Sequence, residues 1–498
     1  MAISPAARSR LLSSVSAAVV GAMSVLAFAP FGVFPLTVVS LAVLVWLLQR
    51  APRPRDGFAL GFAWGLGAFL AGISWLFVAL NRYGGMPVPL AALAILLFCA
   101  YLALYPALAG ALFVRLRTGS ATMSAVLFAA LWVAAEGLRG WVFTGFPWLS
   151  IGYSQTPPSP LAGWLPLLGV YGVGGLLAFI AALFALTPWR RVREAFPAVV
   201  AITALVTGGF GLGRMAWTQP EGEPLRVALV QTNIAQELKW RPEHVRDWLE
   251  LNLYMSDIPD ADLVVLPEST LPMLAEYLPD GYLDTLAARA AAYGGDLLFG
   301  VFLRDAQGQV FNSTASLGAS PSQTYAKRHL VPFGEYSPPL FGWFYTLADI
   351  PMSDQTPGAA HQPPLRLSGQ HIAVNICYED LFGRELLYAL PEASLMLNVS
   401  NLAWYGHSFA QPQHLQIARV RALETGRPML RATNTGMTAV VQPDGRVSEV
   451  LPQFERGVLR AEVTGYTGMT PYARWGDWLA FVLAGLGLAA AAIARCRR

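Results

Sequence analysis

Hydrophobic and polar positions divide the chain into two kinds of region. Residues 1–220 and 474–498 contain long apolar runs, whereas residues 222–470 mix apolar and polar positions as a water-soluble domain does. A helix that crosses a bilayer needs roughly 20 apolar residues. On that basis we predict eight membrane-spanning helices, at about 11–29, 34–49, 57–80, 88–114, 121–137, 163–187, 196–214 and 475–494. The second of these runs is short, and the fifth carries Glu136 near its end.

The middle of the chain alternates short β-type runs with helical stretches. Strands are predicted at Leu225–Gln231, Asp262–Pro267, Leu297–Phe302, Ser313–Leu317, Thr324–Lys327, Ile372–Cys377, Leu395–Ser400, Met429–Ala432, Thr438–Gln442 and Val458–Val463. Helices are predicted at about 242–257, 280–293 and 407–425. Such alternation favours an α/β domain in which helices cover a sheet. We therefore expect a transmembrane domain of seven helices at 1–220, a globular domain at 221–470, and a last helix with a basic tail at 471–498.

The charges indicate how the chain crosses the membrane. Arginines occur before the first predicted helix, in every second connection after it, and at the end of the chain. Because basic loops stay in the cytoplasm, we expect both termini there and the globular domain on the outer face, which is the periplasm of a Gram-negative bacterium. The first apolar run could instead be a signal peptide, although it lacks a clear small-residue cleavage site.

The overall composition excludes some classes of function. Only 13% of the residues are charged, the net charge is +3, and 55% are hydrophobic. The sequence has no basic stripe and no nucleic-acid-binding module, so we expect no nucleic-acid partner. The six histidines do not occur at the spacing of metal ligands, so we expect no metal and no cofactor.

Polar side chains lie at the ends of four of the predicted strands, where α/β folds place their chemistry. Glu268 follows the second strand, Lys327 ends the fifth with Glu335 eight residues later, and Cys377 ends the sixth. The fourth group is the run 398–401. Cys377 is expected to be unpaired, because Cys99 lies within a predicted helix and Cys496 at the cytoplasmic end.

These residues suit acyl transfer through a thioester. The thiol of Cys377 would attack a carbonyl, and Glu268 would act as general base and acid. Lys327 and a backbone N–H near Tyr378 would stabilise the oxyanion, while Glu335 would hold Lys327 or the base. Each residue alone also has a simpler interpretation: a lone cysteine is often a small buried apolar residue, and single charges usually lie at the surface.

Two further segments are rich in aromatic or apolar residues. The outward connection 138–162 contains Phe146 and Trp148, which could anchor the interface or line a lipid site at the membrane surface. Residues 338–352 are apolar yet fall in a loop. They could form a lid or acyl-chain gate, or a loop that stays packed on the domain.

A Glu–Lys–Cys set, carried here on residues 266–269, 325–327 and 376–379, resembles the carbon–nitrogen hydrolase (nitrilase) superfamily. With eight predicted spans, the chain is similar to the membrane-embedded branch of that superfamily, the bacterial apolipoprotein N-acyltransferases. Further motifs match that branch at 330–336, 398–406, 419–424 and 140–148. The resemblance covers nearly the whole chain.

The resemblance implies an α-β-β-α sandwich for the globular domain and a ping-pong reaction in the inner membrane. An acyl chain would pass from a phospholipid, expected to be phosphatidylethanolamine, to the nucleophile. It would then pass to the α-amino group of the diacylglyceryl-cysteine of an apolipoprotein. The enzyme is expected to act as a monomer. By motif match, Glu268, Lys327 and Cys377 are catalytic with support from Glu335, and the predicted substrate-binding residues are Trp240, Tyr378, Glu379, Trp148 and Phe146.

Two other functions remain open from the residues alone. A membrane-tethered amidase acting on a small amide would share the same catalytic set, although the membrane part is large for an anchor. A transporter with a sensing domain is disfavoured because the predicted spans contain few charges, whereas ion and substrate paths usually carry some.

Overall fold

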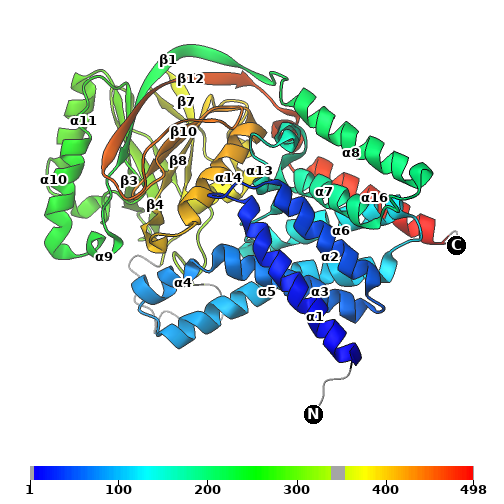
Figure 1. The fold of residues 1–498 in the computed structure, drawn as a ribbon. Helices are drawn as coiled ribbons and strands as arrows, with labels where there is room; N and C mark the ends of the chain where they lie inside the picture. The colour runs from blue at the N-terminus through cyan, green and yellow to red at the C-terminus, as the bar shows by residue number, and fades with distance from the viewer. Residues whose placement is uncertain (1–4, 338–353, 497–498) are drawn as a thin grey trace. The chain divides into compact units, whose positions relative to one another are not determined.

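The computed structural model describes residues 5–337 and 354–496 (Figure 1). The chain divides into two compact units. The helical unit comprises Met1–Leu76, Pro89–Met215 and Trp475–Arg498, and the sheet unit comprises Phe77–Val88 and Ala216–Arg474. The predicted lid at 338–352 lies outside the described residues.

The helical unit contains the eight predicted helices. They are α1 (Pro5–Met23), α2 (Pro35–Arg50), α3 (Pro54–Ile73), α5 (Val88–Leu116), α6 (Ala121–Arg139), α7 (Leu165–Leu186), α8 (Val192–Leu212) and α16 (Trp478–Cys496). Within the described residues, seven helical segments are long and apolar enough to cross a membrane, and α2 is a shorter apolar helix. The sequence thus located all eight helices, and the short second run is the one that falls below spanning length.

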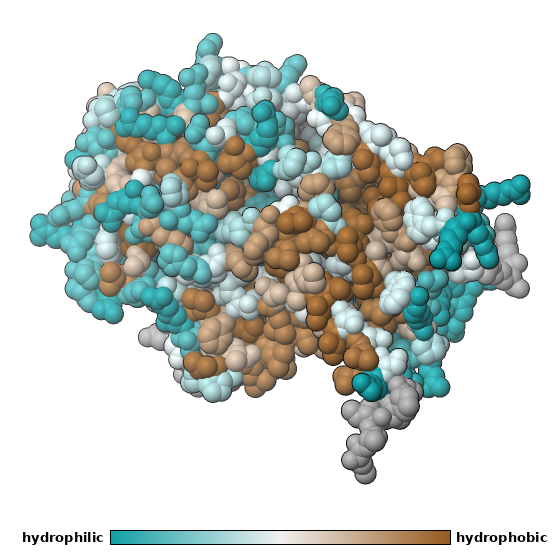
Figure 2. All heavy atoms as spheres, in the orientation of Figure 1, coloured by the Kyte–Doolittle hydropathy of each residue, from teal (hydrophilic) through white to brown (hydrophobic). Residues whose placement is uncertain are grey.

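Many apolar side chains on these helices face outward. Exposed leucines, valines and phenylalanines lie along α5 and α8, among them Leu93, Leu97, Leu108, Phe196 and Val199. Figure 2 shows apolar side chains gathered over the helical unit. Exposed apolar surface on this scale is typical of helices that face lipid.

The predicted span 57–80 was too long. Helix α3 ends at Ile73, and the apolar run continues as α4 (Leu76–Val78) and a π-helix (Ala79–Tyr83). From Phe77 onward this continuation belongs to the sheet unit. There the Tyr83 ring packs edge-on against Trp404, with 5.9 Å between ring centroids. Hydropathy alone does not register this tertiary contact, so the pattern merged two elements.

The sheet unit is built on two six-stranded sheets. The first has the order β12-β1-β2-β3-β4-β5, with bounds Gly457–Gly468, Thr218–Gln231, Leu263–Val265, Asp296–Arg304, Val310–Gly318 and Thr324–Ala326. The second has the order β11-β10-β9-β8-β7-β6, with bounds Val447–Val450, Ala439–Val441, Met429–Thr433, Leu395–Ser400, Gln370–Ile376 and Leu365–Leu367. All ten predicted strands are present. The two missed strands, β6 and β11, are short edge strands with alternating or mostly exposed residues.

Three apolar layers hold the sheet unit together. The central layer joins the facing sides of the two sheets, with side chains such as Leu229 and Val399 fully buried. A second layer packs α10 (Val245–Met255) and α11 (Tyr282–Ala292) on the first sheet. The third packs α14 (Ala410–Thr425) on the second sheet. This arrangement confirms the predicted α-β-β-α sandwich (Figure 1).

Strand direction brings the polar residues together. Strands β1, β2 and β3 run parallel, as do β7, β8 and β9. The carboxyl ends of parallel strands lie at one edge of a sheet, which is where ligands bind in open α/β sheets. Glu268 follows β2 and Cys377 follows β7, so each lies at such an edge.

Candidate active site

Glu268 is held rigidly at the end of β2. Its Oε1 accepts a hydrogen bond from Asn312 Nδ2 at 2.9 Å, and its Oε2 accepts one from the backbone N–H of Asn401 at 2.8 Å. The neighbouring strand can approach only because Gly300 has no side chain: a Cβ there would lie 2.8 Å from the Glu268 carbonyl carbon. The carboxylate therefore has little freedom to turn away from the site.

Lys327 bridges two carboxylates. Its Nζ donates to Glu335 Oε1 at 2.6 Å and to Glu268 Oε1 at 3.3 Å, and the lysine side chain is 1% exposed. Glu335 is fixed in turn, because its Oε2 accepts from the backbone N–H of Val331 at 2.8 Å. We refer to Glu268, Lys327 and Glu335 as the Lys327 cluster. The structure brings together these three residues, which the sequence placed on separate segments.

Cys377 starts a tight turn at the end of β7. The strand ends at Ile376, one residue earlier than predicted, and the turn Cys377–Leu381 is a 3₁₀ helix. Cys377 has φ of 54°, in the left-handed region that non-glycine residues rarely adopt. Its carbonyl oxygen accepts from Asn398 Nδ2 at 3.0 Å. Strained backbone of this kind often occurs at functional sites, and here it sets the direction of the half-buried thiol.

The Lys327 cluster acts electrostatically on the thiol. Burial raises the pKa of Cys377 well above its ordinary value; Glu268 raises it further, and Lys327 opposes the rise. Burial alone would lower the pKa of Lys327, but Glu268, Glu335 and Cys377 together hold it above its ordinary value. The resting thiol is therefore neutral at pH 7, the lysine is charged, and attack by the sulfur requires a base to take the proton.

Glu379 binds main-chain groups on both sides of the site. Its Oε1 accepts from the backbone N–H groups of Arg328 and His329, at 2.7 and 3.1 Å. Its Oε2 accepts from the N–H of Ile376 at 2.6 Å, and both oxygens accept from the hydroxyl of Tyr325. This buried carboxylate joins the segment after Lys327 to the strand before the thiol. Its bonds favour a positioning role over the predicted contact with substrate.

The other predicted binding residues of the sheet unit lie around these groups. Tyr378 is 8% exposed, and its ring packs edge-on against Phe382 and His329. Trp240 packs on Phe302, and its indole Nε1 is buried without a hydrogen-bond partner among the described residues. An indole N–H with no protein acceptor is suited to a polar group of a ligand.

A second set of buried charges includes Asp380 of the same turn, and the sequence did not indicate it. Asp380 Oδ1 lies 2.7 Å from His414 Nε2, and Asp380 Oδ2 accepts from Arg431 Nη1 at 2.9 Å. Arg431 Nη2 lies 3.0 Å from His414 Nδ1. Because a guanidinium only donates, His414 must accept at Nδ1 and donate from Nε2, which makes it neutral. Burial also lowers the pKa of His414. We call Asp380, His414 and Arg431 the Asp380 cluster.

Phe146 and Trp148 lie in the helical unit, in the segment after α6. Their rings stack with 6.4 Å between centroids, and Trp148 also packs on Trp75. Among the described residues, no group of three or more His, Cys, Asp or Glu side chains has the geometry of a metal site.

Two family profiles and several curated proteins match this chain over most of its length. The family profile for the "Apolipoprotein N-acyltransferase N-terminal domain" matches residues 20–183, and the one for "Carbon-nitrogen hydrolase" matches residues 226–472. An apolipoprotein N-acyltransferase of Nitrosomonas europaea is 47% identical over 96% of this chain and 97% of its own. The chain belongs to the apolipoprotein N-acyltransferase family.

Two other members of this family give similar values. The apolipoprotein N-acyltransferase of Chromobacterium violaceum is 45% identical over 94% of this chain and 91% of its own, and that of Ralstonia nicotianae is 44% identical over 99% and 95%. The similarity spans both the helical unit and the sheet unit. Family membership is therefore not confined to the nitrilase-like domain, which a soluble amidase would also contain.

Proposed function

We propose that this protein is a multi-pass membrane acyltransferase that completes lipoprotein maturation. It moves a fatty acyl chain from a phospholipid to the α-amino group of the N-terminal diacylglyceryl-cysteine of an apolipoprotein. The observation that carries this proposal is a half-buried thiol that interacts electrostatically with a Glu–Lys–Glu cluster, in a chain whose relatives match it over nearly its full length.

In the first half-reaction, the thiol of Cys377 attacks the ester carbonyl of the phospholipid. Glu268 takes the thiol proton, because the raised pKa of the thiol leaves it neutral until a base removes the proton. Lys327 has three N–H donors, of which the carboxylates occupy two, so one is left for the carbonyl oxygen as negative charge develops. Glu268 returns the proton to the departing alkoxide, and a lysophospholipid leaves.

The second half-reaction reverses these roles. The α-amine of the apolipoprotein attacks the thioester, Glu268 takes a proton from the amine, and the thiolate of Cys377 leaves and is reprotonated. Glu335 holds Lys327 in place throughout, and Glu379 keeps the two sides of the site aligned. Trp240, Tyr378, Phe146 and Trp148 are proposed to contact the lipid or the lipopeptide.

The orientation and the donor are part of the same proposal. Arginines in alternate connections support cytoplasmic termini and a periplasmic sheet unit in the inner membrane of a bacterium. We propose phosphatidylethanolamine as the acyl donor and a monomer as the active form of the enzyme. The proposed domains are a transmembrane domain at 1–220, a catalytic domain at 221–470, and a last transmembrane helix with a basic tail at 471–498.

The test is acyl transfer by the purified protein in detergent. A synthetic peptide with an N-terminal diacylglyceryl-cysteine should gain one fatty acyl amide when phosphatidylethanolamine is supplied, and lysophospholipid should appear in equal amount. An N-acetylated copy of the peptide should gain nothing, because its amine is blocked. Release of free fatty acid with no acylated peptide would indicate a hydrolase and would refute the proposal.

A further inference from the structure

The segment after α6 has an unusual backbone. Phe143, Thr144, Gly145 and Leu149 all have positive φ, between 53° and 87°. Three of these four are not glycine, so the chain does not favour this shape by itself. Something outside the segment must hold it.

Arg139, the last residue of α6, supplies that hold. Its guanidinium donates to the carbonyl oxygens of Phe146 and Trp148, at 2.5 and 2.7 Å, and to the hydroxyl of Ser150 at 3.0 Å. The backbone N–H of Phe146 donates back to the carbonyl of Arg139 at 2.9 Å. These bonds go to main-chain groups or to a small hydroxyl, so Arg139 sets the path of the backbone.

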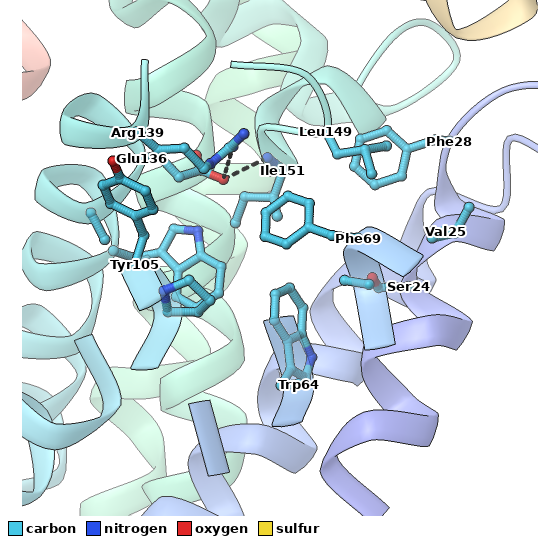
Figure 3. Close-up of a pocket in the computed structure, with 14 residues that line it drawn as sticks. Ser24, Val25, Phe28, Trp64, Phe69, Tyr105, Glu136, Arg139, Leu149 and Ile151 are labelled. Atoms are coloured by element: carbon cyan, nitrogen blue, oxygen red, sulfur yellow. Dashed lines mark hydrogen bonds and ion pairs between the residues drawn. The ribbon is translucent and has the colours of Figure 1, made fainter. Parts of the chain in front are cut away.

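Glu136 completes the arrangement one turn earlier in α6. Its Oε1 accepts from the backbone N–H of Ile151 at 2.9 Å and lies 3.8 Å from Arg139 Nη2. Both side chains are at most 6% exposed, within a unit of apolar helices (Figure 3). Charges are costly inside such helices and persist mainly where they serve a function.

The cavity beside this ion pair is not itself a lipid site. It has a volume of about 30 Å³, and its walls include Phe69, Trp64 and Tyr105 (Figure 3). That space fits a water molecule but no acyl chain. The effect of the ion pair must therefore be exerted through the segment it holds.

The segment presents aromatic rings. Trp141 and Phe143 are 76% and 82% exposed, and Phe146 packs edge-on against Phe98. Aromatic side chains at the end of a membrane helix lie at the depth of lipid headgroups and upper acyl chains. The rings keep their positions only while the backbone keeps its left-handed residues.

We propose that Arg139 and Glu136 are positioning residues that hold residues 141–148 in the shape that receives the acyl chain of the phospholipid donor. This inference rests on the proposed function, because it takes a phospholipid as the donor. It adds a specific device by which the helical unit contributes to donor recognition.

The test separates lipid recognition from chemistry. Arg139→Gln should raise the KM for dioleoyl phosphatidylethanolamine at least tenfold. It should leave kcat with the phospholipid within twofold of wild type. The acylation burst with p-nitrophenyl acetate, a small donor without a lipid chain, should also stay within twofold of wild type. An unchanged KM, or an equal loss with both donors, would overturn the inference. If wild type forms no acyl-enzyme from phospholipid at all, the proposed function fails instead.

A second variant covers the case in which Arg139→Gln does not fold. The double change Trp141→Ala and Phe143→Ala removes two exposed rings and leaves the ion pair intact. It should raise the KM for the same phospholipid while the p-nitrophenyl acetate burst is retained. Retention of the wild-type KM in this variant would contradict the role given to the segment.

A different observation supports a second inference, about Lys239. The chain contains 34 lysines and arginines, of which only Lys239 and Lys327 are lysine. Both are buried, and both donate to Glu268: Lys327 to its carboxylate, and Lys239 to its carbonyl oxygen at 3.2 Å. An ammonium is compact, whereas a guanidinium needs room for a planar fork of donors. Lysine occurs at the two positions that meet Glu268, and arginine supplies the other basic side chains.

We infer that Lys239 is a positioning residue for Glu268, holding the main chain of the base while Lys327 meets its carboxylate. Burial lowers the pKa of Lys239 to about 8 and the charge of Glu268 opposes the change, so the ammonium is still mostly protonated at neutral pH. Its bond to the carbonyl is available in the working enzyme.

The experiment compares Lys239→Met with Lys239→Arg. Both should slow acyl-enzyme formation about tenfold or more with little change in KM, because a methionine cannot donate and an arginine does not fit. The acid limb of the rate profile should also move to higher pH in Lys239→Met, because a positive charge near the base is lost. Full activity of either variant, or a loss that appears only as a higher KM, would refute the inference.

Discussion

Two sets of charged side chains lie near the turn that carries Cys377, and they differ in net charge. In the Lys327 cluster, one cation faces two carboxylates, so the set has a net negative charge beside the thiol. In the Asp380 cluster, one carboxylate meets one guanidinium and a neutral imidazole, so the charges balance. The side chains of the Asp380 cluster are fully buried, whereas Glu335 of the Lys327 cluster is 13% exposed.

The difference in net charge suits the Lys327 cluster to catalysis and the Asp380 cluster to structural support. In the proposed mechanism, the unbalanced cluster keeps a base and a spare donor ready for a proton and an oxyanion, at a cost in electrostatic energy. A balanced cluster fixes geometry, because each of the two carboxylate oxygens of Asp380 already has a partner. Asp380 lies three residues after Cys377, so this support acts on the turn that carries the thiol.

The largest effect should follow from removing the thiol. Cys377→Ala should abolish both acyl-enzyme formation and transfer, because no other group of the Lys327 cluster is a comparable nucleophile. Cys496→Ser, which removes an exposed thiol, is the matched control and should keep full activity. Intact-protein mass after incubation with phospholipid is the measurement. An acyl adduct on the Cys377→Ala protein would break the account.

Within the Lys327 cluster, the two carboxylates should not be equivalent. Glu268→Gln should slow acyl-enzyme formation by about 10²–10⁴, the range for a lost general base. Glu335→Gln should slow it less, because in the proposed mechanism this residue holds Lys327 and moves no proton itself. Rapid-quench rates with phospholipid would decide between them. Equal losses of rate would contradict the different roles proposed for the two carboxylates.

Gly300→Ala tests how tightly the base must be placed. The added Cβ would lie 2.4 Å from the backbone nitrogen of Ser269 and 2.8 Å from the carbonyl carbon of Glu268, so the base must move. A displacement near 1 Å can cost up to about 10²-fold in rate. Gly211→Ala is the control, since nothing lies within 4 Å of a Cβ there. We expect slower acylation in the first variant and unchanged acylation in the second.

The smallest effect on the rate of acyl transfer should come from a change in the Asp380 cluster. Asp380→Asn leaves the buried charge of Arg431 without its partner, which should destabilise the fold by roughly 3–5 kcal/mol. Asp380 also raises the pKa of Cys377, so its neutralisation should lower that pKa. More thiolate would then be present at a given pH, and iodoacetamide alkylation of Cys377 should rise at lower pH than in wild type.

The control for this prediction is Asp444→Asn, which removes a carboxylate from an exposed ion pair with Arg446. It should alter neither the thermal unfolding of the protein nor the alkylation profile, since exposed pairs contribute little. An alkylation profile of Asp380→Asn that stays in place, or that moves to higher pH, would show that this carboxylate does not act on the thiol.

The sequence predicted the parts of the site that end strands. Glu268 and Cys377 come at the end of apolar β-type runs, and Lys327 ends the short predicted strand Thr324–Lys327, so their positions at strand ends singled them out. Their meeting point depends on how distant strands pair, which a single sequence does not record. Asn312 illustrates the limit: it lies inside β4, yet it donates to both Glu268 and Glu335, at 2.9 and 3.3 Å.

The Asp380 cluster could not be predicted from the sequence. His414 lies on α14, whose residues look polar enough for a surface helix, although almost all of that helix is buried. Polar residues become buried where specific partners satisfy them, and Asp380 and Arg431 come from distant segments. The continuation of α3 into the sheet unit was hidden for a similar reason, because an apolar run looks the same whether lipid or protein covers it.

The central claim is that Cys377 carries the acyl chain between two substrates. Purified protein should be incubated with phosphatidylethanolamine bearing a deuterated acyl chain, and its intact mass and peptide masses measured. We predict a gain of one labelled chain, located on the peptide that contains Cys377, removed by hydroxylamine and discharged by a diacylglyceryl-cysteine peptide. A wild-type protein that transfers the labelled chain without ever carrying it on Cys377 would contradict the account.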